Sequence, residues 1–231
     1  QADVQILLDL INRLTNYGAM SDKTSESATR ANLIEAGLFL FGHKGFEATS
    51  TRQLAARAKT NIASIAYHFG GKAGLRTACA RAVAERVGAV VPPDSPPEGI
   101  TSAEALARIE RISEALVTLI LSAPQAQDMV AFMVRELADP GEIADLIYAE
   151  FLAPRHSAMS ALWAAATGRS PEDEEVKLAV FATIGQILYF HIARPFVERR
   201  MDWKTIGPEQ TRRISALIVA NLRAAIERQS L

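Results

Sequence analysis

Hydroxyl, amide and basic side chains gather in one short stretch of the 231-residue chain, between Thr49 and Lys72. Ser50 and Gln53 have the spacing of a capping box, so we expect a helix to begin beside Thr49 and Ser50. The free N–H groups and positive dipole end of a helix favour a phosphate, although capping alone also explains both hydroxyls. Arg52 lies one turn further on, where it either reaches such a partner or is simply solvated.

A second short helix is predicted directly after the first. Lys59, Thr60 and Asn61 interrupt the apolar pattern, which resumes over 62–69 and ends at a Gly-Gly pair. Two short helices joined by a tight turn, with a longer helix on each side, are typical of a helix-turn-helix module. The residues of the turn would approach a DNA groove first, and small side chains at 63 and 64 would let the helix lie deep.

The flanking sequence predicts helices and no strands. Before the module, an apolar stripe over 33–41 stops at Gly45, a good left-handed C′ residue, and Phe46 can fold back on that helix end. After the module, a helix is expected from Lys72 to Val90, and the proline-rich stretch 92–99 is a stiff connector. Further helices are predicted at 101–122, 125–138, 142–166 with a kink near Pro154, 173–195 and 208–229.

Composition narrows the class of protein. Hydrophobic residues make up 49% of the chain, which excludes a disordered chain, and Ala and Leu favour helices. A single cysteine fits a reducing cytoplasm, and we expect a cytoplasmic location. No apolar run reaches the roughly 18–20 residues of a membrane span, and no secretory signal is visible. Residues 1–20 are expected to be either a native N-terminal helix or an artefact of cloning or of a start set too far upstream.

The run FGHKGFEATSTRQLAARAKTNIASIAYHFGGKAGL resembles the DNA-binding signature of the TetR family of bacterial transcriptional regulators. The resemblance covers 33–78. It implies that positions 60–64 read or abut bases and that Tyr67, His68 and Lys72 hold phosphates, although the two rings could instead be scaffold. Where the family commonly has Gly-Val-Ser, this chain has Lys-Thr-Asn-Ile at 59–62, which leaves the base specificity open. The predicted DNA-binding residues are Thr49, Ser50, Arg52, Lys59, Thr60, Asn61, Ala63, Ser64, Tyr67, His68 and Lys72.

The C-terminal half resembles a narrower subgroup, the CecR-like regulators, over 133–162 and 185–203. This resemblance implies a small-molecule effector, commonly an antibiotic or other xenobiotic. The resemblance to TetR-type proteins implies a homodimer in which the last two long helices pair with their copies. A core within one chain is the alternative for those helices. We therefore expect an all-α fold with a helix-turn-helix domain at 21–72, a connecting helix at 73–91 and an effector-binding and dimerisation domain at 100–231.

An effector pocket in a helical domain would be mostly apolar with a few polar groups that orient the ligand. For each candidate, core packing or a surface position is the alternative, and Arg135 with Glu136 could be only a structural ion pair. The candidates are Phe132, Met133, Arg135, Glu136, Tyr148, His156, Trp163, Gln186, Tyr189, Phe190 and His191.

No pattern for enzyme chemistry is present. The four histidines lack metal-ligand spacing, and nucleophile, phosphate-loop and dinucleotide motifs are missing. We expect no catalytic residue, metal or cofactor. The predicted function is a homodimeric repressor that binds a palindromic double-stranded DNA operator and is released by an effector. An activator or ligand-independent regulator of the same fold, a helical enzyme, and an adaptor acting through residues 1–20 are the alternatives.

The net charge of −1 hides an uneven distribution. Residues 21–90 carry ten Lys and Arg against five Asp and Glu, a net charge of +5. Residues 91–231 carry fourteen against nineteen, a net charge of −5. The basic N-terminal part is therefore the end expected to meet DNA phosphates.

Overall fold

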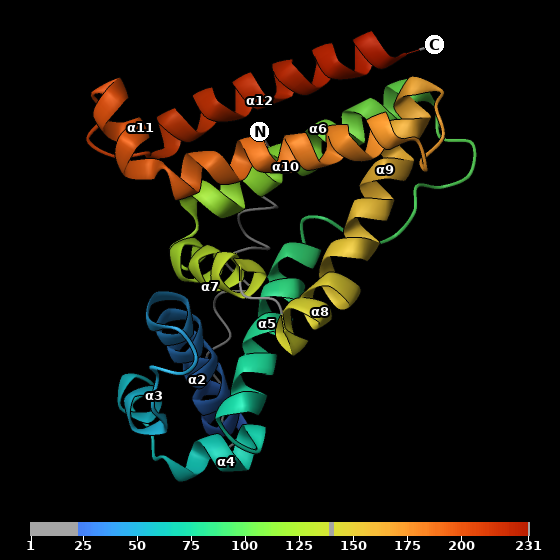
Figure 1. Cartoon of the computed structure of the whole chain (residues 1–231). Helices are drawn as coiled ribbons and strands as arrows, with labels where there is room; N and C mark the ends of the chain where they lie inside the picture. The colour runs from blue at the N-terminus through green and yellow to red at the C-terminus, as the bar shows by residue number, and fades with distance from the viewer. Residues whose placement is uncertain (1–22, 139–140, 231) are drawn as a thin grey trace. The chain divides into compact units, whose positions relative to one another are not determined.

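The computed structural model describes residues 23–138 and 141–230, and every regular element within these ranges is helical (Figure 1). The all-α fold class predicted from the sequence is confirmed. Residues 1–20 lie outside the described residues, so both interpretations of that segment stay predictions.

The chain divides into two compact units, which are described separately. Of the described residues, the first unit holds those up to Arg86 and those from Asp128 to Ile147, and the second holds Val87–Gln127 and those from Tyr148 onward. The functional boundaries expected from the sequence, at 21–72, 73–91 and 100–231, stay predictions.

The first unit packs short helices against longer ones. Its core contains Leu33, Phe41, Leu54, Ile65 and Leu75, all fully buried. Because α3 and α4 are only two turns long, each depends on this shared core rather than on its own helix propensity. The helices that build the unit are α2 (Lys23–Lys44), α3 (Thr51–Arg57), α4 (Ala63–Phe69), most of α5 (Lys72–Gly88) and of α7 (Ala126–Ala138), and α8 (Glu142–Ile147).

The end of α2 follows the sequence prediction. Gly45 adopts a left-handed conformation with φ of 88°, and its N–H donates to the carbonyl of Phe41 at 2.9 Å. Phe46 folds back so that its ring centroid lies 5.6 Å from that of Phe41. The chain therefore leaves α2 in a fixed direction toward α3.

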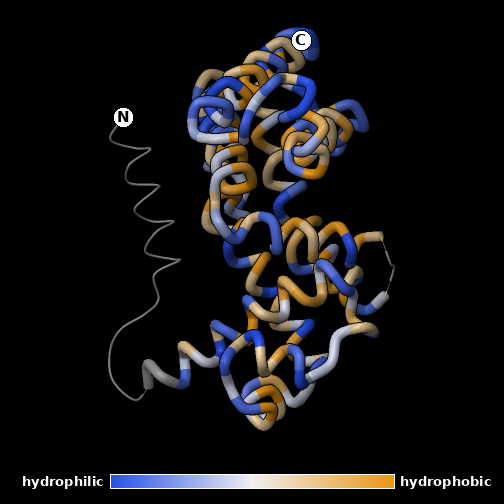
Figure 2. Tube along the Cα trace, turned by 90° about the vertical axis from the view of Figure 1, so that its left-hand side faces the viewer, coloured by the Kyte–Doolittle hydropathy of each residue, from blue (hydrophilic) through white to orange (hydrophobic). Residues whose placement is uncertain are grey.

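The second unit is a bundle in which α6 packs against α9, α10 and α12. Trp163 is fully buried in it, and its indole N–H donates to the Gln229 side chain at 2.8 Å. Hydrophobic and hydrophilic residues are interspersed along these helices (Figure 2). The helices are α6 (Ser102–Ser122), a π-helical turn η1 (Tyr148–Leu152), α9 (Ala153–Thr167), α10 (Glu174–Ile192), α11 (Arg194–Met201) and α12 (Pro208–Gln229).

Two prolines set helix boundaries in this unit. The break expected near Pro154 is present as the turn η1, after which the proline stands in the first turn of α9. The helix predicted over 173–195 instead ends at Ile192, and Pro195 stands in the first turn of a separate helix, α11. A proline has no N–H to donate, so the hydrogen-bond ladder stops before it and a new helix starts. The sequence prediction missed α11.

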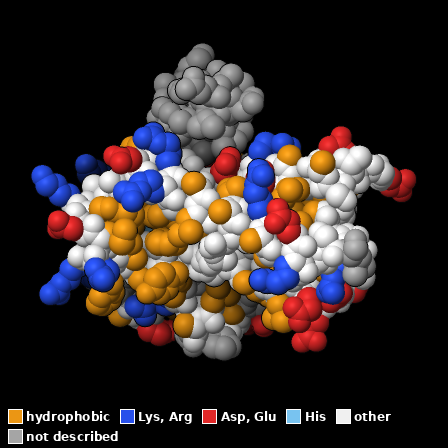
Figure 3. All heavy atoms as spheres, turned by 90° about the horizontal axis from the view of Figure 1, so that it is seen from above, with side chains coloured by type: hydrophobic (Ala, Val, Ile, Leu, Met, Phe, Trp, Pro, Cys, Tyr) orange, Lys and Arg blue, Asp and Glu red, His pale blue; other side chains and the backbone are white. Residues whose placement is uncertain are grey.

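One face of α10 is apolar and exposed. Leu178, Phe181, Tyr189 and Ile192 are each more than half exposed, and Leu217 of α12 is similarly exposed. Viewed onto the α12 side of the second unit, hydrophobic side chains gather between charged ones (Figure 3). By length and hydropathy α10 could cross a membrane, a test that core helices of soluble proteins also pass.

Candidate nucleic-acid interface

Helix α3 is held at its start by the predicted capping box, which is confirmed. Ser50 has extended backbone angles and accepts a hydrogen bond from the N–H of Gln53 at 3.2 Å. The Gln53 side chain accepts one from the N–H of Ser50 at 2.9 Å. Two backbone donors are thereby satisfied, and exposed Arg52 occupies the first turn that this cap fixes.

The turn between α3 and α4 has its own local bonds. Lys59 takes a left-handed conformation with φ of 54°, which reverses the chain in one residue. The side-chain oxygen of Asn61 accepts from the N–H of Ala63 at 3.0 Å and so ties the turn to the first residue of α4. The hydroxyls of Thr60 and Ser64 lie 3.0 Å apart. The tip of α4 is therefore rigidly placed before any partner binds.

Helix α4 is anchored on one side and open on the other. Ile65 is fully buried, whereas Tyr67 is 75% exposed. A hydrogen bond from its phenol to the Glu26 carboxylate raises the pKa of Tyr67. Ile62, which the apolar pattern over 62–69 includes, is 44% exposed and shares the open face with Ala66. The i, i+4 spacing of this pair is the signal that could have found them.

Thr49 corrects a sequence prediction. Its side chain is 1% exposed, and its hydroxyl donates to the carbonyl of Gly45 at 2.7 Å. A hydroxyl turned inward in this way does not present itself to a phosphate, so Thr49 braces the loop instead. The half-buried Lys72 braces the same loop, since its ammonium donates to the carbonyls of Phe46 at 2.9 Å and Thr49 at 3.0 Å.

The remaining predicted DNA-binding residues lie at the surface around α3 and α4. Their contact with DNA stays a prediction. Exposed side chains are Ser50, Arg52, Lys59, Asn61, Ala63 and Tyr67, and partly exposed ones are Thr60, Ser64, His68 and Lys72.

Helix α7 binds α5 through a buried ion pair. The Glu136 carboxylate is 2% exposed and accepts two hydrogen bonds from Arg76, at 2.9 and 2.6 Å. The Arg76 guanidinium also lies over the ring of Phe46, 4.7 Å from its centroid. Because Lys72 stacks on the same ring at 4.1 Å, the ion pair and the loop before α3 share one set of contacts.

Helix α7 also caps the end of α2. Arg135 donates to the carbonyls of Gly42 at 3.0 Å and His43 at 3.5 Å, both in the last turn of α2. A side chain at Gly42 would collide with the backbone of Phe132, so the glycine allows the two helices to approach closely. His43 in turn lies 3.0 Å from Asp128. The N-terminal part of the chain is therefore fastened to α7 within the first unit.

These contacts account for three predicted effector residues in another way. Phe132, Arg135 and Glu136 contact other residues of the first unit. These contacts fit the alternative role given for them above, core packing or a structural ion pair. In the second unit, His156 stacks on Phe181 at 4.1 Å and Trp163 belongs to the core. The structure does not bring the eleven candidates together: Met133 and Phe190 are partly exposed, Tyr148 and Tyr189 are mostly exposed, and Gln186 accepts a hydrogen bond from Asn221.

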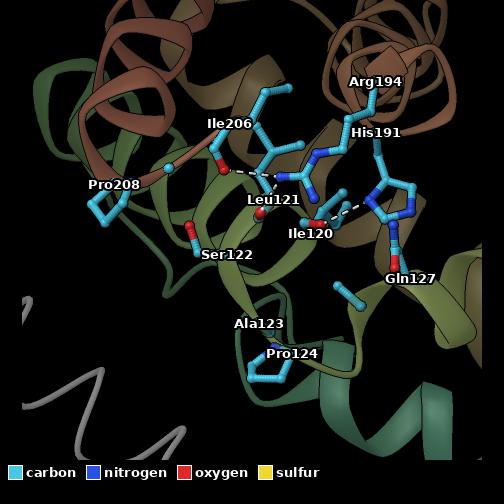
Figure 4. A pocket seen from close by; sticks show the side chains of 12 residues that line it. Ile120, Leu121, Ser122, Ala123, Pro124, Gln127, His191, Arg194, Ile206 and Pro208 are labelled. Atoms are coloured by element: carbon cyan, nitrogen blue, oxygen red, sulfur yellow. Dashed lines mark hydrogen bonds between the residues drawn. The ribbon is translucent and has the colours of Figure 1, made fainter. Parts of the chain in front are cut away.

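His191 lines a pocket. This pocket of about 280 Å³ lies in the second unit at the C-terminal end of α6 (Figure 4). His191 and Arg194 point into it from α10 and α11, and Ile206 closes it from the turn before α12. The lining residues come from three stretches, 120–127, 191–194 and 206–208. Because the first stretch is distant in sequence from the other two, spacing along the chain did not indicate this pocket.

Comparison with known proteins agrees with this arrangement. The family model "Bacterial regulatory proteins, tetR family" matches residues 33–79. The model "HTH-type transcriptional dual regulator CecR, C-terminal domain" matches residues 105–227. The dual regulator CecR of Shigella flexneri is 30% identical over 213 residues, covering 90% of this chain and 94% of the relative.

Solved structures share the fold. AibR in complex with isovaleryl coenzyme A and operator DNA superposes with a TM-score of 0.62 at 15% identity, covering 84% of this chain and 97% of AibR. A TetR-like regulator from Rhodococcus sp. RHA1 gives a TM-score of 0.64 at 12% identity, covering 90% and 99%. This chain belongs to the TetR family of transcriptional regulators, within the subgroup that carries the CecR C-terminal domain.

Proposed function

We propose that this chain is a homodimeric cytoplasmic repressor that a small molecule, such as an antibiotic or other xenobiotic, releases from a palindromic DNA operator. The observation that carries the proposal is the open face of α4, held rigidly by the Asn61–Ala63 hydrogen bond and the buried Ile65. Rigid placement matters because a recognition helix must present base contacts in a fixed register.

The proposed DNA contacts are of two chemical kinds, contacts to base edges and contacts to phosphates. Asn61, Ile62 and Ala63 occupy the tip of α4, where an amide can pair with a base edge and an apolar group can touch a thymine methyl. Ser50, Arg52 and Tyr67 surround the tip and are the proposed phosphate contacts, which fix register without reading sequence, whereas Lys72 supports them by holding the loop before α3. The net charge of +5 over 21–90 supports binding to the polyanion.

The apolar face of α10 supports the homodimer. Monomeric soluble proteins rarely expose a contiguous patch of this kind, and a second copy related by a two-fold axis would cover it. Leu178, Phe181, Tyr189 and Ile192 would then be buried together with Leu217. Two recognition helices about 34–36 Å apart would read the two halves of a palindrome.

A second function of the same fold has one observation in its favour. The relative from Shigella flexneri is named a dual regulator, which suggests that activation is also open to this chain. The names of the other relatives describe regulators rather than enzymes, which supports a regulator without catalytic activity.

The proposal is tested by selecting a binding site from random DNA with the full-length protein. We expect a palindromic sequence, a dimer in sedimentation analysis, and lower transcription from a promoter that carries the site. Selection of no sequence at low salt would contradict DNA binding. A monomer that binds a single half-site would contradict the dimer, and higher transcription would replace repression by activation.

A further inference from the structure

The pocket at the end of α6 has an apolar wall and a polar part of similar extent. The side chains of Ile120, Leu121, Pro124, Ile206 and Pro208 form the apolar wall, and polar side chains with backbone carbonyls form the rest (Figure 4). An apolar cavity of about 150 Å³ takes up benzene. The volume of about 280 Å³ here therefore admits a single ring with a substituent, and it falls just below the roughly 300 Å³ at which pockets for drug-sized ligands begin.

His191 offers this pocket a hydrogen-bond acceptor. Its Nδ1 lies 2.9 Å from the carbonyl of Ile120, and a carbonyl can only accept, so Nδ1 carries the hydrogen. Burial lowers the pKa of His191, so the ring is neutral near pH 7. In a neutral imidazole whose Nδ1 is protonated, Nε2 keeps its lone pair and accepts.

Arg194 does not make the pocket a site for anions. Its Nη2 donates to the carbonyls of Leu121 and Ile206, both at 3.0 Å, and its Nε lies 3.4 Å from the Glu198 carboxylate. The positive charge is thus already compensated. The C-terminal end of α6 adds a partial negative charge, which favours ligand groups that donate a hydrogen bond.

We propose that this pocket is the effector site and that it takes an uncharged single-ring molecule that carries a hydrogen-bond donor, a phenol being the simplest. The ring lies against the apolar wall, and the hydroxyl donates to Nε2 of His191. The assignment rests on the proposed function, because an effector is needed only if the chain is a ligand-responsive regulator.

Helix α7 supplies the route from this pocket to the DNA-binding elements. Ala126 and Gln127 line the pocket and are the first two residues of α7. Arg135 and Glu136, near the other end of the same helix, hold α2 and α5. A ligand that restrains the first turn of α7 therefore acts on a helix whose later turns position the loop before α3. The ligand shifts the DNA-binding equilibrium by its different affinity for the two states.

The test uses full-length protein labelled with 13C on histidine rings, and phenol as the probe. The His191 signal is assigned by its loss in His191→Gln. We expect phenol to shift that signal with a dissociation constant of roughly 1 mM, and anisole, which has no donor, to bind at least tenfold more weakly. Ala123→Phe fills the pocket and should abolish the shift, whereas Ala103→Phe, at the exposed start of α6, should leave it unchanged.

Equal binding of phenol and anisole, or no shift at His191, would overturn the ligand class and the site. Because this comparison uses the unsubstituted protein, it stands even if Ala123→Phe fails to fold. A parallel DNA-binding measurement separates the two proposals. A protein that selects an operator but ignores phenol refutes only the pocket assignment. A protein that binds phenol but selects no DNA sequence refutes the proposed function.

Discussion

The polar side chains that begin α3 and α4 bond to atoms two or three residues away, whereas two side chains at the pocket also join segments about seventy residues apart. Ser50 bonds to Gln53, and Asn61 bonds to Ala63. By contrast, His191 bonds to Ile120 and Arg194 to Leu121. The local bonds make the DNA-binding tip rigid by itself. The distant bonds make the pocket depend on the packing of its whole unit.

The largest expected effect comes from truncating one large side chain in the core of the second unit. Trp163→Ala should lower the free energy of unfolding by about 3–5 kcal/mol, because a fully buried indole leaves a cavity. Urea denaturation measures the loss, and hydrogen exchange reports where it falls. Amides of α3 and α4 should keep their protection, because the first unit has its own core. Equal loss of protection there would contradict the independence of the two units. The half-buried Trp203 gives a matched control, Trp203→Ala, with a smaller effect.

Breaking the buried ion pair is the next largest effect and falls on the first unit. Glu136→Ala should cost about 3 kcal/mol, the lower end for a broken buried pair, because Arg76 stays partly exposed. Thermal denaturation measures the loss. Leucine at both positions should recover most of it, since no charge is then left unpaired. Glu142→Ala, at an exposed carboxylate on α8, serves as the control and should change stability by less than about 0.5 kcal/mol. Similar losses for both alanine variants would show that the pair does not hold α7.

A smaller effect isolates the local bonds of the helix-turn-helix. Ser50→Ala removes the N-cap of α3 and should cost about 1 kcal/mol of stability. Ser50→Gly should cost only a few tenths of that amount, since glycine also tolerates the cap conformation. Chemical denaturation distinguishes the two. If alanine and glycine had equal effects, the capping hydrogen bond would not be what stabilises α3.

The smallest expected effect is a change in how the free energy of unfolding depends on pH, through His191 of the second unit. Burial lowers the pKa of His191 in the folded chain. The unfolded residue titrates near 6.5, so below about that pH the unfolded chain binds a proton that the folded chain resists. The free energy of unfolding should therefore fall as the pH drops below about 6.5. His191→Gln should flatten this dependence. An unchanged slope in His191→Gln would show that the ring is not held neutral.

The sequence predicted the elements whose signals are local. The stop at Gly45, the return of Phe46 and the capping box of Ser50 are all encoded within four residues, and the structure confirms each. Thr49 shows the limit of such patterns. Its place beside a helix N-terminus was correct, but which way a hydroxyl points depends on the neighbouring carbonyl of Gly45.

The effector side of the site could not be predicted in the same way. The sequence predicts Arg135 and Glu136 as ligand candidates because a pocket in a helical domain is mostly apolar with a few polar side chains that orient the ligand. Their partners, in α2 and α5, lie at sequence distances that no periodicity reports. The pocket needs three separate stretches to meet, and α11, which contributes Arg194, depends on the chain break at Pro195.

The central claim is that the tip of α4 reads DNA, and one measurement tests it most directly. Fluorescence anisotropy with the selected operator should give a dissociation constant of roughly 10 nM or tighter at physiological salt for the full-length protein. Asn61→Ala should weaken binding at least tenfold. Equal affinity for the Asn61 variant and the unsubstituted protein would contradict the account.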